Sequence, residues 1–274
     1  KIEGLDDANF AKKKSEKRKD CILTITEGLS AKTYVVQGMK YGLVSRFGNL
    51  VKGRDYIGAI AIRGKFINPR GKSMKSISKN KEVKAIIHAL GLEVGNDYSK
   101  EENLDNIRYN KVIAYTDSDT DGFHIVGLLY NFLNYMYNDI LKIPGFFSFA
   151  RTPIMKVIYK QEKLVFYYLS LAKQFMKDNV VKNKKYYKGL GTSNTKDVRE
   201  DFGKRIVDLV PDSETNTLID NIFNSKKSEF RKNWITTFDP SKIKIIESED
   251  NEIEQLSVST FINEEFINFS IDDC

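Results

Sequence analysis

The chain carries three aspartates at alternate positions, directly after a short apolar segment. Val112 to Tyr115 is typical of a β-strand, and Asp117, Asp119 and Asp121 follow it within one loop. Three carboxylates this close together repel one another unless a cation lies among them. Because all the donors are hard oxygen atoms, the sequence predicts a site for a divalent metal ion.

Two other interpretations of the triplet remain open. A calcium-binding EF-hand loop needs glycine at position six, a bidentate glutamate at position twelve and a helix before the loop. Counting from Asp117, Gly122 meets the first requirement, but position twelve is Leu128 and the preceding segment is strand-like. An acidic surface turn that binds no ligand is the simpler alternative.

A second predicted strand with an acid at its end lies upstream. Cys21 to Thr26 is rich in β-branched and apolar residues, Glu27 follows it, and Gly28 permits a tight turn into a helix. Ligands of open α/β sheets bind outside the carboxyl ends of the strands. If the two strands are parallel neighbours, Glu27 meets Asp117 and Asp119; taken alone, Glu27 is more simply a surface turn residue.

The order of these motifs resembles a known family. A glutamate after one strand and Asp-x-Asp after a later one is the signature of the Toprim fold, which topoisomerases, bacterial primases and some nucleases share. The narrower spelling resembles eukaryotic-type type IIA DNA topoisomerases, over residues 2 to about 270. The motifs are LDDAN from residue 5, TEGLSAK from 26, IRGKFIN from 62, TDSDTDGFH from 116, YYKGLGTS from 186 and SKKSEFRKNW from 225.

The resemblance implies a fold and a metal set. The fold is α/β, a Toprim (Rossmann-like) mainly parallel sheet flanked by helices, with an appended α+β C-terminal portion. Two Mg²⁺ ions, which Mn²⁺ can replace, are implied: Glu27 and Asp117 hold the first, Asp117 and Asp119 hold the second, and Asp121 is a weaker ligand. Such a pair of ions positions and neutralises a scissile phosphate. Glu27 is also a candidate for proton transfer when DNA is rejoined.

Cations near this site are expected to contact double-stranded DNA. Arg63 and Lys65 leave a predicted strand with Gly64 between them, so both can face one groove. Asn68 can hydrogen-bond to the DNA backbone or to a base.

Four further residues are candidates for DNA contact. By resemblance, Lys226 and Lys227 touch DNA, and a solvated helix face is the alternative. Lys188 and His124 are weaker candidates: Lys188 can instead cap its turn, and His124 can instead have a structural role at a helix start.

Two departures from the family pattern matter. The family motif usually reads Glu-Gly-Asp-Ser-Ala, whereas Leu29 stands at the third position here, which puts the contacts of the missing carboxylate in doubt. The family's tyrosine nucleophile, usually after an arginine, belongs to a winged-helix domain. The pair Arg108-Tyr109 precedes the aspartate strand and matches a structural pair instead, so the chain has no candidate nucleophile.

Composition bounds the class of protein. The 274 residues are 41% hydrophobic and carry a net charge of +7, which suits a polyanionic partner, although 37 acidic residues make the surface mixed. Two cysteines give no disulfide framework, so a reducing, intracellular compartment is expected. The nucleus is expected for a cellular source and the host cytoplasm for a large cytoplasmic DNA virus. No apolar run approaches a membrane span.

Local patterns predict the order of elements. Strands are expected over Tyr56 to Ile62, Ile154 to Tyr159 and Leu164 to Leu169, and helices over Glu82 to Leu90 (capped by Gly91), Phe123 to Tyr137, Lys196 to Leu209 and Ser213 to Phe230. We expect four regions: a linker over 1–20, the Toprim core over 21–145, the rest of the Toprim region over 146–246, and an acidic linker over 247–274 into a winged-helix domain.

The leading hypothesis is the metal-binding Toprim part of an ATP-dependent type II DNA topoisomerase, which cleaves, passes and religates double-stranded DNA. The missing initiator methionine and the end at Cys274 lead us to expect a piece of a longer, homodimeric polypeptide, in which ATP binds another domain. The alternatives are another Toprim enzyme, a nuclease or a primase, and a non-catalytic DNA-binding module with a structural metal.

Overall fold

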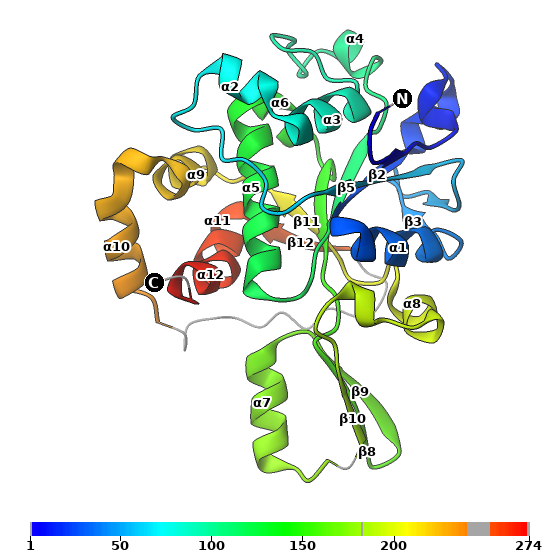
Figure 1. The fold of residues 1–274 in the computed structure, drawn as a ribbon, viewed down its shortest axis with the longest axis vertical. Helices are drawn as coiled ribbons and strands as arrows, with labels where there is room; N and C mark the ends of the chain where they lie inside the picture. Colours follow the sequence, from blue (N-terminus) through cyan, green and yellow to red (C-terminus); the bar gives the residue numbers. More distant parts are fainter. Residues whose placement is uncertain (1, 182, 240–252, 273–274) are drawn as a thin grey trace.

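The computed structural model describes residues 2–181, 183–239 and 253–272. At its centre is a seven-stranded sheet with helices on both faces (Figure 1). Parallel pairing joins β5 to β2, β2 to β6, β6 to β7 and β11 to β12, whereas β1 and β11 run antiparallel to β5 and β7. The predicted α/β class with a mainly parallel sheet is confirmed. The strand order is β1 (Leu5–Asp6), β5 (Ile57–Ile62), β2 (Ile22–Glu27), β6 (Lys111–Tyr115), β7 (Phe147–Ala150), β11 (Ile206–Val210) and β12 (Glu254–Ser257).

Two core layers lie on opposite faces of this sheet. Successive side chains of a strand point to opposite faces, so in β2 Ile22 joins one layer while Leu23 and Ile25 join the other. A strand that is buried on both faces is composed mainly of apolar and β-branched residues, as β2 and β6 are. The larger layer packs under α3 (Lys81–Leu90), α5 (Thr120–Met136) and α9 (Thr215–Phe223), and the smaller under α1 (Gly28–Gly38) and α8 (Thr195–Asp201).

Gly91, with φ of 73°, ends α3 in the left-handed conformation, as the sequence predicts.

The remaining elements are short. The other elements are η1 (Phe10–Lys12), η2 (Glu16–Asp20), β3 (Leu43–Val44), β4 (Leu50–Val51), α2 (Met74–Lys79), α4 (Glu101–Leu104), α6 (Asn138–Leu141), η3 (Leu190–Thr192), η4 (Ser225–Lys227), α10 (Ser228–Thr236), α11 (Val258–Thr260), the π-helical η6 (Phe261–Phe266) and α12 (Ile267–Asp272).

A second, antiparallel sheet projects from the central body together with α7 (Leu169–Asp178) (Figure 1). Its strands lie in the order β10 (Asn183–Tyr186), β8 (Met155–Tyr159) and β9 (Glu162–Phe166). The strand expected over 154–159 is therefore present, whereas the one expected over 164–169 is wrong in its second half, because β9 ends at Phe166 and α7 begins at Leu169. The helix expected over 196–209 is wrong in its second half: α8 ends at Asp201, Gly203 adopts φ of 77°, and the apolar segment after it becomes β11.

Both expected linkers need correction within the described residues. Near the start, β1 pairs with β5, and Leu5, Ala8 and Ala11 are buried in the larger core layer. Near the end, β12 pairs with β11, and η6 packs against α5. The acidic composition of the tail hides apolar residues that reach the core, and the sheet also crosses the expected boundary at residue 145. Residues 247–252 lie outside the described residues. No helix of the described part has the length and apolar character needed to cross a bilayer.

Candidate metal centre and nucleic-acid interface

The predicted acidic residues lie at one edge of the central sheet. Strands β2 and β6 are parallel neighbours, paired from Ile22 with Lys111 to Thr26 with Tyr115. Glu27 is the last residue of β2, and Asp117 follows β6 by two residues. Parallel strands in register bring their carboxyl ends to the same edge. A strand precedes the aspartates, so the EF-hand interpretation, which needs a leading helix, is wrong.

The three aspartates have different environments. Asp119 is the N-cap of α5, and its carboxylate accepts a hydrogen bond of 2.8 Å from the backbone N–H of Gly122. Asp121 is exposed in the first turn of α5 and lies 3.1 Å from the Lys65 Nζ. Asp117 is half-buried and accepts a hydrogen bond of 2.8 Å from the backbone N–H of Leu190. Asp121 thus already has a cationic partner, whereas Asp117 and Asp119 are held by backbone amides.

Burial and mutual repulsion raise the pKa values of two carboxyl groups at this site, those of Glu27 and Asp117. Burial raises the pKa of Glu27 to about 7, and the negative charges of Asp117, Asp119 and Asp121 add to the shift. Burial also raises the pKa of Asp117, with Asp119 adding to the shift and the Leu190 amide opposing it. Carboxylates that disfavour joint ionisation would gain from a cation placed between them.

The donor set fits a hard divalent ion that shares its coordination with a substrate. Among the residues that the structure describes, no three or more His, Cys, Asp or Glu side chains are grouped as a ready metal cage. Mg²⁺ usually takes only one or two carboxylates and completes its shell with water and phosphate oxygens. Glu27 and Asp117, whose pKa values are both raised, would supply those carboxylates, with Asp119 beside them.

A turn of the YYKGLGTS motif closes this edge of the sheet, and the sequence interpretation missed its role. Leu190 of this motif lies 73 residues from Asp117 in the chain, yet its amide contacts the Asp117 carboxylate directly. The glycines flanking Leu190 were the only local signal, and alone they do not specify a ligand. Lys188 is exposed in the same turn, so its ammonium group is accessible to a phosphate.

The cations expected beside the site are accessible. The Arg63 side chain is 82% exposed and lies 3.5 Å from the Glu3 carboxylate, which is equally exposed. Lys65 is half exposed, and its Nζ lies 4.7 Å from the centre of the Phe269 ring. Weak surface ion pairs of this kind are readily exchanged for phosphate contacts.

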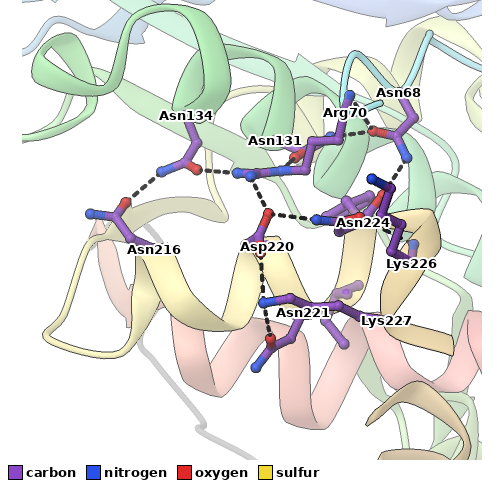
Figure 2. Close-up of polar contacts among 12 residues, drawn as sticks. Asn68, Arg70, Asn131, Asn134, Asn216, Asp220, Asn221, Asn224, Lys226 and Lys227 are labelled. Carbon is purple, nitrogen blue, oxygen red and sulfur yellow. Dashed lines mark hydrogen bonds and ion pairs between the residues drawn. The ribbon is translucent and has the colours of Figure 1, made fainter. Parts of the chain in front are cut away.

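Asn68 is instead engaged within the fold, as Figure 2 shows. Its Nδ2 donates to the backbone carbonyl of Phe223 at 2.7 Å, and its Oδ1 accepts from the Arg70 backbone N–H at 3.1 Å and from Asn131 Nδ2 at 3.0 Å. The Arg70 guanidinium donates to Asn131, Asn134 and Asp220, each at 2.7 Å. Asn68 therefore helps to join the loop after β5 to α5 and α9.

The same network distinguishes Lys226 from Lys227 (Figure 2). The Lys227 Nζ lies 2.7 Å from Asp220 Oδ2 and donates to Asn221 Oδ1 at 2.8 Å. Lys226 is exposed, and its backbone N–H donates to Asn224 Oδ1 at 3.1 Å. The hydrogen bond from Lys227 is the main cause that lowers the pKa of Asp220. Lys227 is thus neutralised within the fold, whereas Lys226 faces solvent.

Three further residues from the sequence analysis have clear positions. The His124 ring stacks on Phe269, with ring centres 3.8 Å apart, so it packs α5 against α12. Leu29 is 73% exposed in the first turn of α1, two residues after Glu27. Tyr109 is fully buried and donates its hydroxyl to Asp7, which Arg108 also contacts. The Arg108-Tyr109 pair is therefore structural, as expected.

The chain is similar in sequence and fold to known proteins. Residues 150–274 match the family described as the C-terminal associated domain of TOPRIM. The chain is 36% identical to DNA topoisomerase 2 of Invertebrate iridescent virus 6 over 268 residues, which cover 93% of this chain and 24% of that protein. It is also 36% identical to DNA topoisomerase 2-alpha of Rattus norvegicus over 286 residues, 99% of this chain and 18% of the relative.

A solved structure gives the same result. The topoisomerase II DNA-binding, cleavage and re-ligation domain of Plasmodium falciparum superimposes with a TM-score of 0.82 at 31% identity, covering all of this chain and 36% of that one. The chain is thus a Toprim-containing α/β protein. It is homologous to the Toprim region of type II DNA topoisomerases, and it spans about a quarter or less of the length of the two curated relatives.

Proposed function

We propose that this chain supplies the metal-binding half of the DNA-cleavage site of a type II topoisomerase that cuts and rejoins double-stranded DNA. The observation that carries the proposal is the meeting of Glu27 and Asp117 at one sheet edge with raised pKa values. When bound, Mg²⁺ or Mn²⁺ would neutralise the scissile phosphate and stabilise the attacking and leaving oxygens.

The side chains of this chain have separate tasks in this proposal. Glu27 and Asp117 would hold one ion, and Asp117 and Asp119 a second. Glu27 is also the candidate acid and base that exchanges a proton with the DNA oxygen that leaves and returns. Arg63 and Lys65 would bind neighbouring phosphates.

Other parts of the reaction are assigned by relationship to the family. The tyrosine nucleophile and the ATP site are proposed to lie in other domains of the parent polypeptide, which would act as a homodimer. The compartment would be the nucleus in a cell, or the host cytoplasm for a cytoplasmic virus.

Relaxation of supercoiled plasmid by the parent enzyme, with Mg²⁺ and ATP, tests this proposal. Glu27→Gln should slow cleavage by about 100-fold or more, because proton transfer and metal binding both depend on this carboxylate. Glu102→Gln, at an exposed acid of α4 away from the cluster, is the matched control and should leave cleavage unchanged. Metal-dependent nicking by the chain alone, lost in Glu27→Ala, would favour a self-sufficient Toprim nuclease.

A further inference from the structure

The turn formed by Gly189 and Leu190 lies directly against the Asp117 side chain. The Leu190 N–H donates to Asp117 Oδ1 at 2.8 Å. A Cβ atom placed on Gly189 would lie 2.7 Å from Asp117 Cγ and 2.8 Å from Oδ1, with Oδ2 nearer still. Its three nearest heavy atoms all belong to Asp117. The turn therefore approaches this carboxylate more closely than any residue with a side chain would allow.

The backbone at Gly189 does not itself require glycine. Its φ of 173° and ψ of 169° describe an extended conformation that any residue adopts. Glycine has another use at positions where the backbone must approach a neighbouring group closely. Here that neighbour is the Asp117 carboxylate, so the missing side chain serves the contact rather than the turn.

The turn is braced on both sides. Before it, the Tyr187 N–H donates to the Ile154 carbonyl at 2.9 Å, and the Tyr187 hydroxyl donates to Asp197 at 2.6 Å. After it, the Thr192 hydroxyl donates to the Gly189 carbonyl at 2.8 Å. The Leu190 side chain is buried in the smaller core layer, beneath α1. Because the turn is fixed at these points, a group added at Gly189 would displace the Asp117 side chain.

We propose that the Gly189–Leu190 turn is a positioning element that sets the orientation of the Asp117 carboxylate for metal binding. The amide of Leu190 donates to Oδ1. Because Gly189 has no side chain, the space next to it is free for Oδ2. Groups that orient a metal ligand in this way typically change metal affinity when they are altered. The metal part of this inference rests on the proposed function, whereas the orienting contact rests on the geometry alone.

A double-mutant cycle on thermal unfolding, in metal-free buffer, tests the contact. Gly189→Ala should lower the unfolding midpoint in the native background, and much less when Asp117→Ala has removed the clashing atoms. Gly191→Ala is the matched control, because its nearest neighbour is Ser30 Cβ at 2.9 Å. Its effect should be the same in both backgrounds. If Asp117→Ala does not relieve the effect of Gly189→Ala, the positioning role is overturned.

Titration with MnCl₂, followed by calorimetry, tests the consequence for metal. Gly189→Ala should weaken binding by about 10- to 100-fold, as changes around metal ligands do, and Gly191→Ala should not. Binding equal to that of the native chain would overturn the inference. If the native chain itself binds no Mn²⁺ even with DNA present, the proposed function fails, while the unfolding cycle still decides whether the turn orients Asp117.

Discussion

Two clusters of charged residues in this molecule differ in whether their charges are paired. Around Arg70, cations and carboxylates are paired, and Asp220 accepts from both Arg70 and Lys227 at 2.7 Å. At the edge formed by β2 and β6, Glu27 and Asp117 have no ion-pair partner among the described residues. The pKa of Asp220 is lowered, whereas the pKa values of Glu27 and Asp117 are raised.

The difference distinguishes a structural cluster from the proposed metal site. Paired charges around Arg70 join the loop after β5 to α5 and α9. Removing one partner lowers the stability of the fold, because the other partner is left without its hydrogen bond. Carboxylates gathered without a counter-ion cost stability in the free protein, and such strain is typical of sites that bind a cation or transfer a proton. The two clusters should therefore respond in opposite ways to mutation, pH and metal.

Removal of the central cation should have the largest effect on stability. Arg70→Met leaves acceptors on Asn131, Asn134 and Asp220 without their donor, so we expect the free energy of unfolding to fall by about 2–4 kcal/mol. Urea denaturation measures the change. Arg63→Met is the matched control, since Arg63 is 82% exposed, and should change stability by less than about 0.5 kcal/mol. Equal losses would contradict the comparison.

The pH dependence of stability should have opposite signs in the two clusters. The pKa of Glu27 in the native state, about 7, lies above its ordinary value of 4.5, so the native state binds this proton more tightly than the unfolded state. The stabilisation from that proton is complete below the ordinary value and is lost as pH rises through about 7. In metal-free buffer, the stability of Glu27→Gln should therefore fall less than that of the native chain as pH rises from 4.5 through about 7. Urea denaturation midpoints across this pH range measure the difference.

Asp220 provides the comparison for this experiment. Its pKa in the native state is lowered, so its contribution to stability is present above its ordinary value of 3.8 and is lost as pH falls through the native value. Asp220→Asn should remove that loss of stability in acid. It should not change the pH dependence of stability near neutral pH. A Glu27→Gln variant with the same dependence on pH as the native chain would contradict the raised pKa.

The smallest predicted effect separates the two adjacent lysines in their binding to DNA. Lys226 is exposed, whereas Lys227 is neutralised by Asp220. Lys226→Ala should reduce the slope of log binding constant against log salt concentration by about 1, because one phosphate contact is lost. Lys227→Ala should change it less. Fluorescence anisotropy of a labelled duplex across a salt series measures the slope for both variants. Equal changes in slope would show that the ion pair with Asp220 does not prevent Lys227 from contacting DNA.

The sequence predicts those features that depend on local pattern. Apolar strands that end in acids placed Glu27 and Asp117 at one edge, since strands separated by helices form parallel sheets. The cap at Gly91 and the core face of α5 also follow from residues near in the chain. These are short-range signals, and the structure bears them out.

Contacts between distant segments had no such signal. Arg70 and Asp220 are 150 residues apart, and Asp117 and Leu190 are 73 apart. Glu265 lies in an acidic tail that reads as a linker, yet it is buried and accepts from Arg151. A charged residue looks the same in sequence whether it is solvated or paired, so only the fold decides which.

Metal titration tests the central claim most directly. Calorimetry with MgCl₂ or MnCl₂ should show weak, millimolar binding to the chain alone and tighter binding with a DNA duplex, because phosphate supplies missing ligands. Asp117→Ala combined with Asp119→Ala should abolish both, whereas Asp220→Asn should not. Absence of binding with DNA present, or binding unchanged by the double substitution, would contradict the assignment of this sheet edge as the metal centre.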